Sequence, residues 1–219
     1  MLAKIEYIPF REVLHYLGWR GSPVDEETEK QIRALIQEVL NDLQPRLVIR
    51  RFPVKPDGTL CGTAFKPQGE DIKKLLASSE DALLIAATLG AHSERQLLRA
   101  QAQDSAKAVL LDAVYSAAIE AVVDQWEEAL RTELVRKGLY LTDRFSPGYG
   151  DLPMSKTREI CEVLSAQREI GLTVSSSGIM IPRKSVTAVL GVSTVPVNRR
   201  PKGCAACEAR AYCALRRPE

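Results

Sequence analysis

The segment from Ser93 to Lys137 most constrains the fold of this chain, because it contains neither proline nor glycine and is rich in alanine, leucine, glutamate and glutamine. Such a composition favours one very long helix, or two helices that abut end to end. In its middle, residues 113–123, alanine, serine and valine occur almost all round the expected helix. These small side chains let another backbone approach closely. We therefore expect the central helix of the fold here, ended by Gly138.

Strand-like patterns lie on either side of this segment. Residues 82–89 form an unbroken apolar run that ends at Gly90, which is typical of a strand covered on both faces. After the central helix, two further strands are expected at residues 172–175 and 185–192, on either side of a loop at 176–184.

The first third of the chain combines helices with one hairpin. Residues 47–52 have a strand pattern, and the turn signature at 55–58 suggests that residues 59–61 return as a hairpin partner. The remaining helices are expected at residues 11–18, after a short extended piece, at 22–44, at 70–77, and at 155–169 with Ser155 as the cap. Together these elements predict an α+β fold: a twisted, mainly antiparallel sheet packed with a long central helix and flanking helices.

Composition places the chain among ordinary globular proteins. Its 219 residues, 45% hydrophobic and 26% charged, suggest one large domain, which we place at residues 1–198, followed by a basic tail at 199–219. A net charge of +2 gives no general argument for a nucleic-acid or membrane partner. No apolar run approaches the ~20 residues that span a bilayer, and charge appears too early for a signal peptide. We expect a cytoplasmic protein without either partner.

The sequence gives little support for a hydrolase. The chain contains only two histidines, His15 and His92, and we read both as structural or surface residues. It has neither a Gly-x-Ser-x-Gly motif, nor a Walker loop, nor a His-Glu-x-x-His motif. The sequence therefore argues against hydrolytic catalysis of these classes.

The turn at residues 144–151 is the most unusual segment, with the sequence Arg-Phe-Ser-Pro-Gly-Tyr-Gly-Asp. A guanidinium such as that of Arg144 grips a carboxylate as a planar fork. The glycines bring backbone polar groups within reach of a ligand, and Tyr149 offers a flat face and a hydroxyl. This combination suits a zwitterionic, partly aromatic small molecule. A helix connector with a surface arginine is the alternative.

Three blocks in order resemble one family, the activation (reactivation) domain of cobalamin-dependent methionine synthase. Residues 144–151 resemble its Arg-x-x-Pro-Gly-Tyr signature, and residues 179–186 resemble its Met-x-Pro-x-x-Ser-Val block. Residues 5–10 are similar to its Ile-Asp-Trp-x-Pro-Phe opening. The blocks extend from near the start of the chain to about residue 195.

The resemblance implies that the chain binds S-adenosylmethionine and caps a cobalamin-binding module, where inactive cob(II)alamin is reduced and remethylated. Arg144 would then pair with the ligand carboxylate, and the backbone from Phe145 through Ser146 to Gly148 would hold the adenine. Glu120 falls where the family has a glutamate near the ligand's amino group, and Glu6 replaces the family's aspartate at the N-terminal contact. Tyr149 and Met180 would face the corrin.

Such a site would provide orientation rather than acid–base chemistry, because reduced cobalamin is a strong nucleophile and the sulfonium is a good leaving group. The chain would thus be a methyltransferase component. A complete methionine synthase also carries homocysteine, methyltetrahydrofolate and cobalamin modules, which 219 residues cannot hold. The corrinoid protein is therefore expected in trans. The chain has no flavin or nicotinamide fingerprint, so an electron donor is expected as a further partner.

The tail lies outside these blocks and contains Cys204, Cys207 and Cys213. Two thiolates at C-x2-C spacing fit one turn around a metal, and a third can close on the same ion. Zinc or a four-iron four-sulfur cluster needs a fourth ligand, for which Cys61, Cys161, an exogenous ligand or a second chain are open candidates. Free or redox-active thiols are the alternative.

Two alternative functions are compatible with some of these sequence features. In the first, the chain is a docking or metal-regulated partner of a corrinoid protein that transfers no methyl group. In the second, it is an iron–sulfur electron-transfer subunit whose active part is the cysteine tail.

Overall fold

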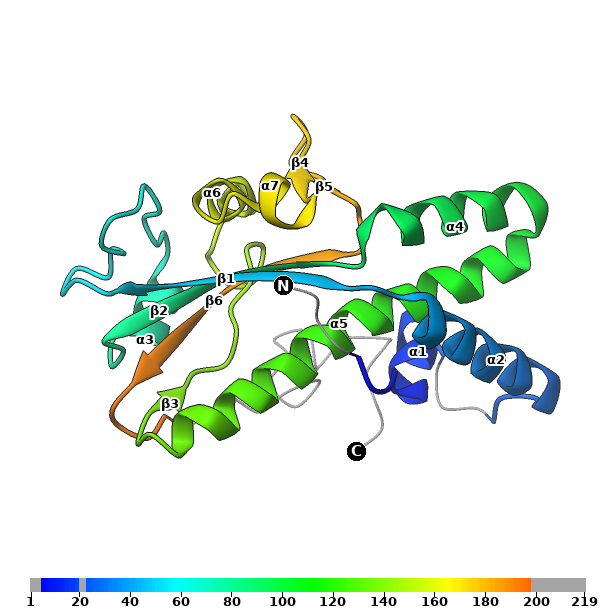
Figure 1. The fold of residues 1–219 in the computed structure, drawn as a ribbon, viewed down its shortest axis with the longest axis horizontal. Helices are drawn as coiled ribbons and strands as arrows, with labels where there is room; N and C mark the ends of the chain where they lie inside the picture. The colour runs from blue at the N-terminus through cyan, green and yellow to red at the C-terminus, as the bar shows by residue number, and fades with distance from the viewer. Residues whose placement is uncertain (1–4, 20–22, 198–219) are drawn as a thin grey trace.

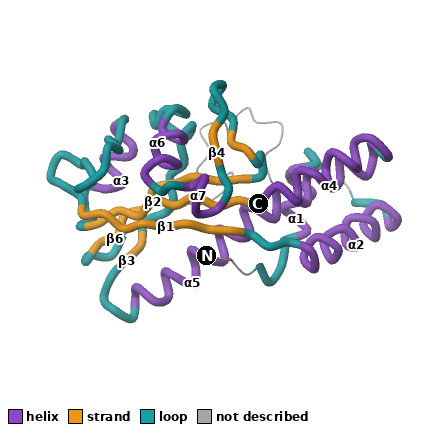
Figure 2. Tube along the Cα trace, turned by 45° about the horizontal axis from the view of Figure 1, so that its top comes forward, coloured by secondary structure: helices purple, strands orange, loops and turns teal. Residues whose placement is uncertain are grey.

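The computed structural model describes residues 5–19 and 23–197 and has the α+β architecture expected from the sequence. Within these residues, a four-stranded antiparallel sheet has the strand order β1-β2-β6-β3. The bounds of the strands are Arg46–Pro53 for β1, Asp81–Thr88 for β2, Tyr140–Leu141 for β3 and Ser185–Ser193 for β6. The sheet lies between two layers of helices, which Figure 2 shows on its opposite sides.

Strand β2 is one of the two inner strands of the sheet, and it confirms the buried strand predicted from its apolar run. It pairs with β1 from Arg46 opposite Thr88 and with β6 from Asp81 opposite Val192. Successive side chains point to opposite faces, so that Leu83 belongs to one core cluster and Leu84 to the other. Both faces of the sheet are therefore buried.

The first face is covered by helices, and α5 (Ser105–Val135) crosses it along its length (Figure 1). Helices α1 (Phe10–Tyr16), α2 (Glu26–Asp42) and α4 (Gly90–Gln103) pack against α5 and share its core cluster. The proline-free segment was expected to form either one very long helix or two abutting helices, and the structure has two, α4 and α5. The extended backbone at Asp104 separates them, and its side chain caps α5 by accepting from the backbone N–H of Lys107 at 3.0 Å.

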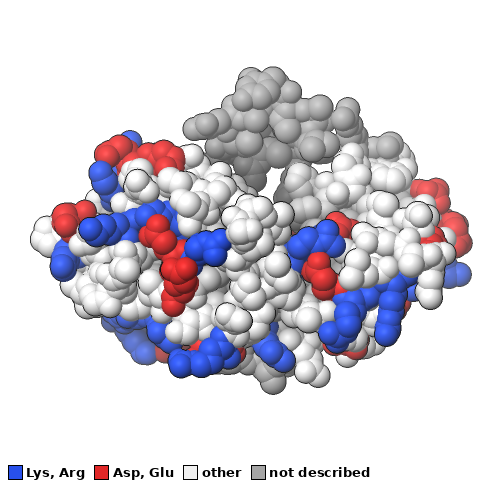
Figure 3. All heavy atoms as spheres, turned by 90° about the horizontal axis from the view of Figure 1, so that it is seen from above, with Lys and Arg blue, Asp and Glu red and all other residues white. Residues whose placement is uncertain are grey.

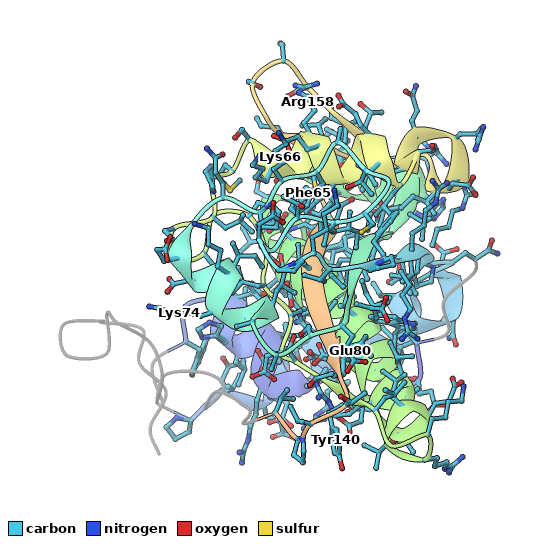
Figure 4. The ribbon with its side chains drawn as sticks, turned by 90° about the vertical axis from the view of Figure 1, so that its left-hand side faces the viewer. Phe65, Lys66, Lys74, Glu80, Tyr140 and Arg158 are labelled. Atoms are coloured by element: carbon cyan, nitrogen blue, oxygen red, sulfur yellow. The ribbon has the colours of Figure 1, made fainter. Side chains whose placement is uncertain are left out.

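The second face is covered by α3 (Glu70–Leu76), α6 (Lys156–Val163) and α7 (Ala166–Ile170). The loop before α3 contributes Phe65, which is fully buried and lies beneath this layer (Figure 4). A small hairpin of β4 (Thr173–Val174) and β5 (Met180–Ile181) stands beyond α6 and α7. Arg158 joins α6 to this hairpin by donating to the main-chain oxygens of Val174 and Ser175.

Several boundaries differ from the sequence predictions. The helix expected at 155–169 is broken by Ser165, whose φ of 52° is left-handed, and Ser155 makes no side-chain capping bond. The expected loop at 176–184 contains β5. Residues 59–61 form only an isolated bridge, from Leu60 to Val54, instead of a strand.

The start of α2 also differs, because its cap is Asp25, whose side chain accepts from the backbone N–H of Thr28 at 2.9 Å. The expected boundary after residue 198 and the cysteine tail lie outside the described residues. No helix in the described part is long and apolar enough to cross a membrane. In the view of Figure 3, positive and negative side chains are interspersed over the visible surface.

Candidate functional site

Helix α5 places a row of carboxylates along one side. Glu120, Asp124 and Glu127 are separated by four and three residues, so their side chains lie on neighbouring turns of one helix face. Glu127 is 1% exposed, and it is the one charged side chain among the buried residues of α5, which are otherwise aliphatic or aromatic. Burial of a charged residue requires a partner of opposite charge.

Arg131 of the same helix is one such partner, and the other is Arg144, in the segment that follows β3. Its Nη2 atom lies 2.5 Å from Oε2 of Glu120, and its Nη1 atom lies 2.5 Å from Oδ1 of Asp124 and 3.1 Å from Oε2 of Glu127. We call Arg144 and these three acidic residues the Arg144 cluster. The structure thus brings together Arg144 and Glu120, which the sequence analysis assigned to one ligand site.

The cluster keeps Arg144 firmly charged. Burial by itself favours the neutral guanidine, but the carboxylates of Asp124, Glu120 and Glu127 outweigh this effect and raise the pKa of Arg144 above its ordinary value. Arg144 is therefore a permanent cation, with carboxylates on more than one side. Such an arrangement can recognise a ligand that carries both signs of charge.

Asp124 and Glu127 were not among the residues chosen from the sequence. The available signal was their spacing from Glu120 along a helix, but acidic residues at this spacing are common on solvated helix faces. What distinguishes these two is contact with Arg144, which is 20 residues from Asp124 and 17 from Glu127. The contact with Arg144 forms because the segment after β3 folds back against α5, which the local sequence does not reveal.

The turn after Arg144 is attached to the edge of the sheet. The backbone N–H of Phe145 donates to Val189 of β6 at 2.8 Å, and the backbone oxygen of Phe145 accepts from Val189 at 2.9 Å. The side chain of Phe145 is buried in the core of the second face. Both main-chain groups of Phe145 are thus engaged with the sheet, and further along the turn the backbone N–H of Gly148 donates to the oxygen of Leu152 at 2.8 Å.

The tip of the turn is open to solvent. Tyr149 is 69% exposed, and its backbone N–H donates to the oxygen of Ser146 at 3.2 Å. Gly148 has a φ of 93° and is close to Met154, so that a Cβ atom there would be 3.3 Å from Met154 Cγ. Glycine at this position therefore permits the tight turn that presents Tyr149.

The far end of the turn is attached to the second face. The carboxylate of Asp151 accepts from the backbone N–H groups of Glu70 at 2.5 Å and Asp71 at 3.2 Å, at the start of α3. It thereby caps this short helix from a distance of 81 residues along the chain. Asp151 was quoted in the signature but was not assigned a role from the sequence.

Tyr16, at the end of α1, is a further neighbour that the sequence analysis missed. Burial raises the pKa of Tyr16 to about 12, and the negative charge of Glu120 and the nearby Tyr149 add to this effect. Its phenol therefore remains a neutral hydrogen-bonding group at physiological pH. Tyr16 also lines an open pocket of about 450 Å³ between α1 and the start of α5, together with Ser105 and Asp112.

Glu6 lies beside the same helix. Its backbone N–H donates to Oε1 of Gln125 at 2.8 Å, and Nε2 of Gln125 donates to the backbone oxygen of Tyr7 at 2.8 Å. These two hydrogen bonds hold the N-terminal segment against α5 at Gln125, the residue after Asp124. The side chain of Glu6 is exposed.

Met180 lies elsewhere in the fold. It is in β5, opposite Val174, and its half-buried side chain packs against the core of the second face. The Arg144 cluster belongs to α5, on the first face. The hairpin nevertheless exposes two apolar side chains, since Ile179 is 54% and Ile181 49% exposed.

No group of three or more His, Cys, Asp or Glu side chains within the described residues could hold a metal ion. Cys204, Cys207 and Cys213 are outside those residues. Of the two candidates for a fourth ligand, Cys61 is partly exposed, whereas Cys161 is buried. Burial raises the pKa of the Cys161 thiol to about 11, which disfavours the thiolate that a metal requires.

Comparison with known proteins identifies the family and the fold of this chain. A family model described as vitamin B12 dependent methionine synthase, activation domain, matches residues 80–195, which include α5 and the turn. A solved structure of the MetH reactivation domain bound to AdoHcy has a similar fold, with a TM-score of 0.65 and 19% identity. The similarity covers 87% of this chain and 77% of that one. No curated protein matches the sequence. The family match spans more than half of the chain, which therefore belongs to the family of vitamin B12 dependent methionine synthase activation domains.

Proposed function

We propose that this chain binds S-adenosylmethionine and presents its methyl group to a corrinoid held by another protein module. The Arg144 cluster carries this proposal, because it places a partly buried cation among carboxylates directly beside the Pro-Gly-Tyr turn. The methionine part of S-adenosylmethionine carries a carboxylate, an ammonium and a sulfonium. The cluster offers groups of opposite charge for all three.

The assignment of ligand groups follows from these charges. Arg144 binds the ligand carboxylate, while Glu120 accepts hydrogen bonds from the ammonium. Glu6, which is exposed and fastened beside α5 through Gln125, adds negative charge near the sulfonium. The backbone from Ser146 to Gly148 contacts the adenine. The neighbouring solved structure, whose domain is bound to AdoHcy, supports a ligand of this class.

The role of this chain in the reaction is to position the methyl group of the ligand. The corrinoid supplies the cobalt nucleophile that accepts the methyl group when the partner module is bound. The exposed ring of Tyr149, followed by Met154 at 59% exposure, gives an apolar surface that suits the flat face of a corrin. The hairpin around Met180 offers a second apolar contact surface for the partner. Holding the ligand against the turn fixes the direction in which its methyl group points.

The first experiment is calorimetric titration of S-adenosylmethionine into the full chain and into the Arg144→Ala variant. We expect micromolar binding to the native protein. The variant loses charged hydrogen bonds and should bind weaker by about 2 kcal/mol, or about 30-fold. Arg168→Ala is the matched control, because Arg168 is 78% exposed on α7 and far from α5 in the sequence.

Three outcomes separate the functions. Native binding that Arg144→Ala weakens and Arg168→Ala preserves supports methyl presentation. Equal binding by all three proteins would place the ligand elsewhere, and absent binding would favour a docking role on the corrinoid module. A thermal unfolding scan of each variant separates loss of a contact from loss of the fold.

We further propose that Cys204, Cys207 and Cys213 bind a metal. Support comes from their spacing alone, which fits zinc or an iron–sulfur cluster with one more ligand. Metal analysis and visible absorbance after anaerobic purification distinguish the two, with Cys207→Ser as the variant that should lose the metal. An iron–sulfur cluster would add electron transfer to the chain, and no bound metal in the native protein would contradict the proposal.

A further inference from the structure

Helices α1, α4 and α5 border the open pocket of about 450 Å³ that Tyr16 lines. Part of its lining is apolar and part carries hydrogen-bonding groups. The apolar part includes Leu17, Ala108 and Val109, and the polar part is formed by Gln101, Ser105 and Asp112 together with the phenol of Tyr16. A pocket that combines an apolar wall with a few polar groups suits a small molecule, or one arm of a larger one.

Tyr16 places this pocket next to the site proposed for S-adenosylmethionine. Its ring lines the pocket, while Glu120 and Tyr149 of that site are among the groups that raise its pKa. Asp112 lies eight residues before Glu120 on α5, which separates the two by about 12 Å along the helix. A corrin held over Tyr149 therefore extends toward the pocket, because the macrocycle carries side arms around its whole rim.

Asp112 is the charged group of the pocket lining. Its Oδ1 atom lies 2.9 Å from Nζ of Lys184, which also donates to the hydroxyl of Ser116 at 2.7 Å. The side chain of Lys184 is 15% exposed, whereas that of Asp112 is 48% exposed. An ionised carboxylate has about four acceptor positions, so a single ion pair leaves Asp112 able to accept from a ligand N–H. Its negative charge repels a ligand carboxylate.

The corrin of vitamin B12 has side arms that end in uncharged primary amides. Such an amide donates through its NH2 group and accepts through its oxygen. The pocket matches both functions, because Asp112 is an acceptor and the exposed hydroxyl of Ser105 is a donor. A corrinoid whose arms end in carboxylates places a negative charge against Asp112 instead.

We propose that this pocket binds a primary amide arm of the corrin and thereby selects amidated corrinoids against their acid forms. Asp112 is the residue that discriminates, because it accepts a hydrogen bond from an amide and repels a carboxylate. The inference rests on the proposed presentation of a methyl group to a corrinoid, and it specifies which corrinoids the chain accepts.

Two corrinoids that share the ring and differ in their arms provide the first test. Cobinamide has amide arms, and cobyrinic acid has carboxylate arms. In absorbance titrations of the full chain, cobinamide should bind at least about twentyfold more tightly than cobyrinic acid. Asp112→Asn removes the repulsion but keeps an acceptor, so the ratio of the two affinities should fall at least about fivefold. A ratio that Asp112→Asn leaves unchanged would overturn the inference.

Glu133→Gln is the matched control for this substitution. Glu133 is also a partly exposed carboxylate of α5 that pairs with a lysine, Lys137, but it is near the other end of the helix. It thus changes the net charge by the same amount, and the ratio of affinities should stay within about twofold of the native value. An equal fall in the ratio for both variants would assign the discrimination to net charge and overturn the role of Asp112.

Filling the pocket provides the second test. Val109 lines the pocket and is 61% exposed, whereas Val135, at the far end of α5, is 52% exposed. We expect Val109→Trp to weaken cobinamide binding about tenfold and Val135→Trp to leave it within about twofold. S-adenosylmethionine should bind all three proteins equally, and thermal unfolding of each checks that the fold is retained.

The outcomes separate this inference from the proposed function. Cobinamide that does not bind the native chain, or that Val109→Trp does not weaken, would overturn the amide site. Weaker S-adenosylmethionine binding by Val109→Trp would assign the pocket to that ligand and also overturn it. Binding of S-adenosylmethionine to the native chain is measured independently of any corrinoid, and its absence would overturn the proposed function.

Discussion

The backbone of Gly69 lies directly against Asp151, so that a Cβ atom on Gly69 would be 2.6 Å from the carboxylate carbon and 2.9 Å from the main-chain oxygen of Asp151. Gly69 also has a φ of 118°, which residues with a side chain rarely adopt. This contact joins α3 to the end of the turn that begins at Arg144. The capping of α3 and the shape of the turn therefore depend on one another.

We predict that Gly69→Ala destabilises the protein by about 2 to 3 kcal/mol, because strain and overlap with Asp151 act together. S-adenosylmethionine affinity should fall as well, since the turn is displaced. Gly58→Ala is the control: Gly58 also has a positive φ, 81°, but an added Cβ would meet nothing within 4 Å. Urea unfolding and calorimetry measure the two effects. Equal destabilisation by both substitutions would show that the cost comes from the positive φ alone and that the overlap with Asp151 contributes nothing.

The buried Tyr115 predicts a loss of stability at high pH. Burial raises the pKa of Tyr115 to about 12 from an ordinary value of 10.0, with smaller effects of Asp42 and Glu38. Below pH 10 the phenol is neutral in the folded and unfolded chains. Between pH 10 and 12 the unfolded chain loses this proton and the folded chain keeps it, so the free energy of unfolding falls by up to about 3 kcal/mol.

Tyr115→Phe isolates this effect from other groups that titrate at high pH. The free energy of unfolding, measured in denaturant from pH 9 to pH 12, should fall more steeply for the native protein than for the variant. Parallel curves would contradict the prediction.

The two described cysteines should differ in reactivity. Cys161 is 7% exposed, and burial raises its pKa to about 11, whereas Cys61 is partly exposed. At pH 8.5 we expect iodoacetamide to alkylate Cys161 at least about tenfold more slowly than Cys61, because less thiolate is present and access is poor. Peptide mass spectrometry measures both rates, and urea should remove the difference. Comparable rates in the folded protein would show that the layer around α6 opens readily.

The two-sided burial of β2 predicts a large cost for truncation within it. Leu84 is 0% exposed, so Leu84→Ala should lower the free energy of unfolding by about 2 to 5 kcal/mol. Leu98→Ala, on α4 where the leucine is 56% exposed, should change it by less than about 0.5 kcal/mol. Urea unfolding with an unchanged slope is the measurement. A small effect at Leu84 would mean that the second layer of helices closes over the cavity.

Local patterns predicted the main elements, because they depend on residues close in the sequence. The apolar run at 82–89 identified β2, and the proline-free segment identified α4 and α5. The break at Asp104 was not located from the sequence. An aspartate can lie inside a helix or cap the start of a new one, and the residue type alone does not distinguish these two positions. The left-handed Ser165 gave no signal, since this conformation usually selects glycine or asparagine.

The candidate site was only partly accessible to sequence reasoning. Arg144 and the turn were chosen from their residue types and from a block that resembles a family, and Glu120 was chosen from the same resemblance. The family itself is confirmed, whereas the roles of these residues remain predictions. Glu127 and Arg131 were not found, because a buried glutamate on a helix cannot be distinguished from a solvated one without its distant partners. Asp151 was missed for the same reason, since its hydrogen bonds are to residues 80 and 81 positions earlier.

The turn at 144–151 is fastened at three points: at Arg144 to α5, at Phe145 to β6 and at Asp151 to α3. Its ends are attached to opposite faces of the sheet, so it bridges the edge between the two layers. Ordering a loose loop costs free energy when a ligand binds, whereas a loop fixed beforehand avoids most of that cost. The proposed binding surface is thus preorganised, and we expect the conformational freedom lost on association to belong mainly to the ligand.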